Sequence, residues 1–150
     1  MNPKKIKIGC ASAFWGDSSS AARQLVEKGD IDYLVFDFLA EMTMSILAGS
    51  KKNNPKMGYA TDFIDQLSPL LETIKSKNIK VISNAGGVNL NSCKEALEEI
   101  AHSLGIALNI AIIAGDDLMS KKNELMGLNI KEMETDKELP DNLLRDRKST

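Results

Sequence analysis

Short apolar runs alternate with amphipathic stretches along most of this chain. The runs that read as buried strands, rich in Val and Ile, are residues 5–10, 33–37, 80–83 and 109–114. Apolar residues at helical spacing fall between them, in residues 17–28, 38–49, 59–78 and 93–105. Continuous rather than alternating apolar strands are typical of a parallel sheet. We therefore expect an α/β fold, with a parallel sheet covered by helices on both faces in a Rossmann-like three-layer arrangement.

Capping and breaking residues predict where the helices begin and end. Asp17 or Ser18 is expected to cap the first helix, and Asn89 or Asn91 the last one. Pro69 lies inside the third helical pattern and should kink that helix or split it in two. The glycines expected to end helices are Gly29, Gly49 and Gly105.

The pattern changes near the carboxyl end of the chain. Residues 1–118 form the predicted α/β core, whereas residues 119–150 are charged and hold one possible strand at 127–134. No apolar helix follows that strand, so the sheet is expected to be incomplete. Residues 119–150 are expected to be either a natural solvated terminus or the place where a longer protein was truncated. An incomplete sheet exposes an apolar edge, which predicts association with a second copy or a partner chain.

Composition and charge exclude several classes of protein. The chain has 150 residues and a net charge of −2, without the basic surface that nucleic-acid binding requires. No apolar stretch is long enough to span a bilayer. Cys10 and Cys93 are the two cysteines, and their separation favours neither a disulfide framework nor a zinc site. We expect a reduced, cytoplasmic protein with no nucleic-acid or membrane partner.

Polar and glycine residues follow each predicted strand, where ligands bind in parallel α/β folds. Those after the first strand are Ser12, Phe14, Trp15, Gly16, Asp17 and Ser18. Those after the other three are Asp37 and Glu41, then Asn84, Gly86, Gly87 and Asn89, and finally Asp116 and Asp117. Their convergence on one edge predicts a ligand site there, although each residue taken singly has a structural alternative as a cap, a turn or a plug.

Each group suggests a different role in such a site. Asn84 and the backbone amides of Gly86 and Gly87 could bind an anion at a helix N-terminus, or could form a tight turn. Asp116 or Asp117 could serve as a general base or hold a cation. Asp37 and Glu41 would share one face of a helix as further catalytic carboxylates. Phe14 or Trp15 would line a site for an apolar or flat ligand, and Gly16 would form the turn.

The remaining reactive side chains fit structural roles better. His102, the single histidine, falls beside an apolar helical stripe and away from any strand end, so a Ser-His-Asp triad is not expected. Cys10 lies near the predicted edge and could act as a nucleophile, but a buried small side chain is the commoner fate of such a cysteine.

Five stretches in register resemble the N-terminal domain of the acyclic terpene utilisation (AtuA) family. They read "IGCASAFWGDSSSAARQL", "DYLVFDFLAEMTMSILA", "GYATDFIDQLSPLL", "VISNAGGVN" and "AGDDL", between residues 6 and 118. The resemblance continues more weakly to about residue 144. Family members are longer, which agrees with an incomplete fold here.

The resemblance implies a part in bacterial breakdown of acyclic terpenes such as citronellol and geraniol, through acyl-CoA-type intermediates. It specifies no reaction, cofactor or metal. On this basis we expect an enzyme or enzyme subunit whose isolated 150-residue chain is inactive. A non-catalytic ligand-binding or assembly subunit, and an inactive fragment of a longer protein, remain the alternatives.

Overall fold

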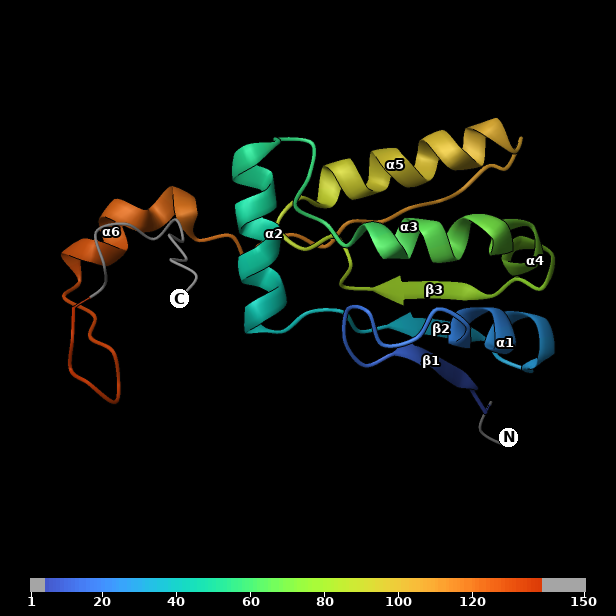
Figure 1. The fold of residues 1–150 in the computed structure, drawn as a ribbon, viewed down its shortest axis with the longest axis horizontal. Helices are drawn as coiled ribbons and strands as arrows, with labels where there is room; N and C mark the ends of the chain where they lie inside the picture. The colour runs from blue at the N-terminus through green and yellow to red at the C-terminus, as the bar shows by residue number, and fades with distance from the viewer. Residues whose placement is uncertain (1–4, 139–150) are drawn as a thin grey trace. The chain divides into compact units, whose positions relative to one another are not determined.

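The computed structural model describes residues 5–138 and divides the chain into two compact units, Met1–Ile112 and Ile113–Thr150. The first unit contains a parallel sheet of β1 (Ile8–Ser12), β2 (Tyr33–Phe36) and β3 (Lys80–Ser83), in that spatial order. Its helices are α1 (Ala21–Lys28), α2 (Glu41–Asn53), α3 (Thr61–Leu67), α4 (Leu71–Ser76) and α5 (Leu90–Ser103). The predicted α/β class is confirmed, and the three-stranded sheet agrees with an incomplete fold (Figure 1).

The helices α1, α3, α4 and α5 pack on one face of the sheet, whereas α2 lies at the end of the sheet (Figure 1). Leu34 and Phe36 point into the core there, which α1, α3, α4 and α5 complete. On the other face Ile8 is 66% exposed and Ile82 is 55% exposed. A sequential strand order explains this difference from the expected three layers, because right-handed crossovers that step in one direction place their helices on the same face.

Three phenylalanines form the centre of the core. Phe36 lies 5.2 Å from Phe63 in an edge-to-face arrangement and 5.5 Å from Phe38, measured between ring centroids. Phe36 and Phe38 are each 1% exposed. The contact fixes α3 against the end of β2, at the edge where the site residues were expected.

Several of the predicted helix ends are confirmed. A short 3-10 turn, Ser68–Leu70, separates α3 from α4 at Pro69. Gly105 follows α5 with a φ of +67°, and the N–H of Ile106 donates to Ala101 O at 2.8 Å, as in a Schellman motif. Asn89 is the N-cap of α5, where its side chain accepts from the N–H of Ser92.

Two other predicted helix ends are wrong. The helix α2 continues through Gly49 to Asn53, because a glycine weakens a helix interior by only about 1 kcal/mol and the next residues sustain the hydrogen bonds. The helix α1 begins at Ala21, four residues after Asp17. The Asp17 carboxylate instead accepts from the N–H of Ala13 at 2.8 Å, within its own loop. The Ser18 hydroxyl does bind the start of α1, where it accepts a hydrogen bond from the N–H of Ala21 at 3.1 Å.

The strand expected over residues 109–114 does not form. This stretch has no regular secondary structure, although Ile110 packs against the core of the first unit. An apolar run becomes a strand only when a neighbour supplies hydrogen bonds, and nothing in residues 5–138 pairs with this one.

The second unit contains the 3-10 turn Met119–Lys121 and α6 (Lys122–Gly127). No strand forms in the described residues at 127–134, where a single bridge pairs Lys131 with Glu138. None of the helices in the described part of the chain combines the length and apolar character needed to cross a membrane.

Candidate functional site at the carboxyl edge of the sheet

The loops after all three strands meet at the carboxyl edge of the sheet. Figure 1 shows the arrowheads of β2 and β3 pointing toward α2, which lies at this end of the first unit. The register of β1 on β2 shifts between Cys10 and Ser12, so that the strand ends in a bulge. Ser12 is thereby buried, and its hydroxyl donates to Asp37 O at 3.4 Å. The bulge thus ties the first loop to the second.

Asn84 joins the second loop to the third. Its side-chain oxygen accepts from the N–H of Phe38 at 2.8 Å, and its side-chain nitrogen donates to the Asp37 carboxylate at 2.7 Å. Because a backbone N–H can only donate, the first bond fixes which end of the Asn84 amide is oxygen. We call this pair the Asp37–Asn84 centre.

The centre is open to solvent and carries an uncompensated acidic group. Asp37 and Asn84 are both exposed, and no ion pair within the described residues includes Asp37. Glu41 is also exposed, at the first position of α2. Asp37 itself precedes that helix, so the expected placement of Asp37 and Glu41 on one helical face is wrong.

The loop after β3 that contains Gly86 and Gly87, here called the glycine loop, packs closely against its neighbours. A Cβ on Gly87 would lie 2.4 Å from Leu47 Cδ1 and 2.6 Å from Gly58 O, and its φ is +54°. A Cβ on Gly86 would lie 2.5 Å from Leu90 Cδ2. Both glycines therefore let the loop approach its neighbours closely.

Asn89 and Lys51 clamp the other side of the same loop. The Asn89 side-chain nitrogen donates to Pro55 O at 2.8 Å and to Met57 O at 2.7 Å. The Lys51 ammonium donates to Val88 O at 2.5 Å. The Asn89 side-chain amide thus has a structural role. The role of Lys51 could not be predicted from the sequence, because its acceptor, Val88 O, lies far along the chain.

The first loop places its two aromatic residues differently. Trp15 is half-buried and packs against the core, whereas Phe14 is 57% exposed. Gly16 has a φ of +91°, and the N–H of Asp17 donates to Phe14 O at 3.2 Å, so the expected turn at Gly16 is confirmed. Of the two aromatic residues, Phe14 is the one available to a ligand.

Asp116 and Asp117 belong to the second unit and follow no strand. Both are exposed, and the Asp117 carboxylate accepts from the N–H of Met119 at 2.9 Å, where it caps a short turn. Their part in a site remains a prediction. Within residues 5–138, no group of three or more His, Cys, Asp or Glu side chains is placed to hold a metal ion.

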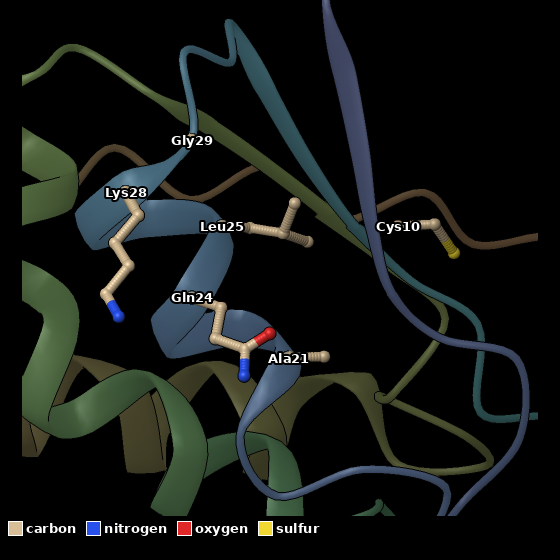
Figure 2. Close-up of a pocket in the computed structure, with 6 residues that line it drawn as sticks. All are labelled: Cys10, Ala21, Gln24, Leu25, Lys28 and Gly29. Atoms are coloured by element: carbon tan, nitrogen blue, oxygen red, sulfur yellow. The ribbon is translucent and has the colours of Figure 1, made fainter.

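A hollow of about 600 Å³ lies between β1 and α1, and none of the predicted site residues lines it. Figure 2 shows Leu25 pointing from α1 toward the strand, while the Cys10 sulfur points away from the helix. The Cys10 thiol donates to Ser12 O at 3.2 Å. The Cys10 thiol is therefore not directed into the hollow.

The two cysteines should differ sharply in reactivity. Cys10 is exposed, whereas burial raises the pKa of the Cys93 thiol to about 11. Because the thiolate is the nucleophile, we expect the native chain at pH 8 to release one equivalent of thionitrobenzoate quickly from Ellman's reagent. The second should appear only in guanidinium chloride. Cys10→Ser should abolish the fast phase, and two fast thiols in the native chain would contradict the burial of Cys93.

Comparison with known proteins identifies one family. A family model described as acyclic terpene utilisation family protein AtuA matches residues 6–147. No curated protein and no solved structure matches this chain.

Proposed function

This chain belongs to the acyclic terpene utilisation family AtuA, and we propose that it is an enzyme or enzyme subunit that binds an acyclic terpenoid at the carboxyl edge of its sheet. The observation that carries this proposal is the Asp37–Asn84 centre, where side chains from two strand ends are hydrogen-bonded at 2.7 Å. Parallel α/β folds bind their ligands at this edge. Phe14 offers an exposed apolar surface in the neighbouring loop.

Within this proposal, Asp37 is the acid–base group and Asn84 positions it. Glu41, at the start of α2, is a further candidate for acid–base chemistry. A role for Asp116 and Asp117, which belong to the second unit, remains a prediction from the sequence. Trp15, Gly16, Asp17 and Ser18 shape the first loop, and Gly86, Gly87 and Asn89 shape the third. An acyl-CoA thioester as the form of the ligand, and a cytoplasmic location, remain predictions.

Titration with geraniol and citronellol tests the binding part. We expect the amide signals of Phe38 and Asn84 in a ¹H–¹⁵N NMR spectrum to shift, while those of Lys7 and Lys80 at the opposite end of the strands stay unchanged. Asn84→Ala removes two hydrogen bonds and should weaken binding about tenfold, since a bond to a charged group contributes about 1.5–3 kcal/mol. Asp65→Asn, on the exposed surface of α3, is the matched control for a polar side-chain change.

A catalytic chain and a non-catalytic binding subunit can be compared by measuring turnover in the same samples. Gas chromatography after incubation would show loss of the terpenoid if the chain is catalytic, and that loss should disappear in Asp37→Asn. Binding without turnover would agree both with a ligand-binding subunit and with the inactivity expected of the isolated 150-residue chain. If neither terpenoid shifts any signal at the carboxyl edge, the proposed site is wrong.

A further inference from the structure

The Asp37–Asn84 centre presents one hydrogen-bond acceptor beside one donor. Asp37 Oδ1 accepts from Asn84, and Oδ2 has no partner within the described residues. The Asn84 side-chain nitrogen carries two hydrogens, of which one is donated to Asp37. The second Asn84 hydrogen and Asp37 Oδ2 therefore both lack a partner within the described residues, on the two side chains that this bond joins.

The backbone amides around the centre are almost all used within the protein. The N–H of Ala85 donates to Ser83 Oγ at 3.0 Å, and that of Gly87 donates to Asn84 O at 3.1 Å. The N–H of Val88 donates to Gly58 O at 2.9 Å. An anion needs several free N–H donors. Most of the backbone N–H groups around Gly86 and Gly87 already donate to acceptors within the protein.

The negative charge of Asp37 also disfavours an anionic ligand. An anionic head group at this centre would lie against the Asp37 carboxylate, which no Lys or Arg of the described residues pairs with. Like charges in contact disfavour binding. A phosphate or carboxylate also has no hydrogen to give to Asp37, and an ammonium group has no lone pair to accept from Asn84.

We infer that the Asp37–Asn84 centre takes a neutral hydroxyl group and excludes anionic head groups. A hydroxyl donates one hydrogen bond and accepts another, so it satisfies Asp37 Oδ2 and the free Asn84 hydrogen together. This inference rests on the proposed function and gives its ligand class, a free alcohol in place of the phosphate monoester or the carboxylic acid with the same carbon skeleton.

The test compares two ligands with the same carbon skeleton on the full 150-residue chain. Geraniol and geranyl monophosphate are titrated separately, and the side-chain NH₂ signal of Asn84 and the amide of Phe38 are followed by NMR. Geraniol should shift both signals in the wild type, and geranyl monophosphate should bind at least tenfold more weakly. Asp37→Lys should reverse this preference, because it replaces the acceptor with a cationic donor.

Asp37→Asn and Asp65→Asn form the matched pair of variants, since each removes one negative charge from an exposed side chain. Asp37→Asn should reduce the difference in affinity between geraniol and geranyl monophosphate. Asp65→Asn should leave that difference in affinity unchanged. Equal or tighter binding of geranyl monophosphate by the wild type overturns the inference but leaves the proposed site standing. Absence of any shift with either ligand overturns both.

Discussion

Replacing Phe36 with alanine is expected to lower the free energy of unfolding by about 3–5 kcal/mol, because a large cavity opens in a packed core. Phe36 is 1% exposed and contacts the rings of Phe38 and Phe63 at centroid distances of 5.5 and 5.2 Å. Its loss also removes the edge-to-face contact with Phe63. Urea unfolding followed by far-UV circular dichroism measures the change as a fall in the midpoint.

Phe14→Ala is the control for this experiment, since it removes the same side chain from a position that is 57% exposed. We expect a change within about 0.5 kcal/mol, as for most surface substitutions. Similar losses for Phe14→Ala and Phe36→Ala would contradict a core centred on the three phenylalanines.

Replacing Gly87 with alanine is the second change with a large expected effect. The new Cβ would lie 2.4 Å from Leu47 Cδ1 and 2.6 Å from Gly58 O, and the φ of +54° strains any residue with a Cβ. Strain and overpacking each cost about 1–3 kcal/mol. We expect a loss of about 2–4 kcal/mol in the free energy of unfolding, together with a shift of the Asn84 signals, because the N–H of Gly87 donates to Asn84 O.

Gly49→Ala provides a control of opposite sign. Gly49 lies inside α2, and nothing stands within 4 Å of the position that its Cβ would take. Alanine is a better helix former than glycine by about 0.8–1 kcal/mol, so the variant should unfold at a higher urea concentration. If Gly87→Ala were as well tolerated, the close packing of the glycine loop on α2 would be wrong.

The candidate site combines residues that the sequence indicates with a geometry that it does not. The sequence places Asp37 and Asn84 after two successive strands, and the fold brings them to 2.7 Å. It also suggests an anion site at Gly86 and Gly87, on the basis of residue types that suit both a ligand loop and a packed turn. The close approach of Gly87 to Leu47 and Gly58 favours the packed turn. Both of these residues lie far from the loop in the sequence.

Several elements of the fold depend on local chemistry and can be read from the sequence alone. The break at Pro69, the cap at Asn89 and the helix end at Gly105 follow from residues within a few positions of each feature. Each is governed by short-range terms: ring geometry, capping and the freedom of glycine at positive φ. The family match over residues 6–147 likewise rests on sequence.

Other features depend on partners that are distant in the chain, and these emerge only in the folded protein. The apolar run at 109–114 does not become a strand, because a strand requires hydrogen bonds from a neighbour that residues 5–138 do not supply. One-sided coverage of the sheet follows from the strand order, which local sequence does not encode. The Asp37–Asn84 centre likewise forms because parallel pairing of β2 and β3 brings together two loops separated by more than 40 residues.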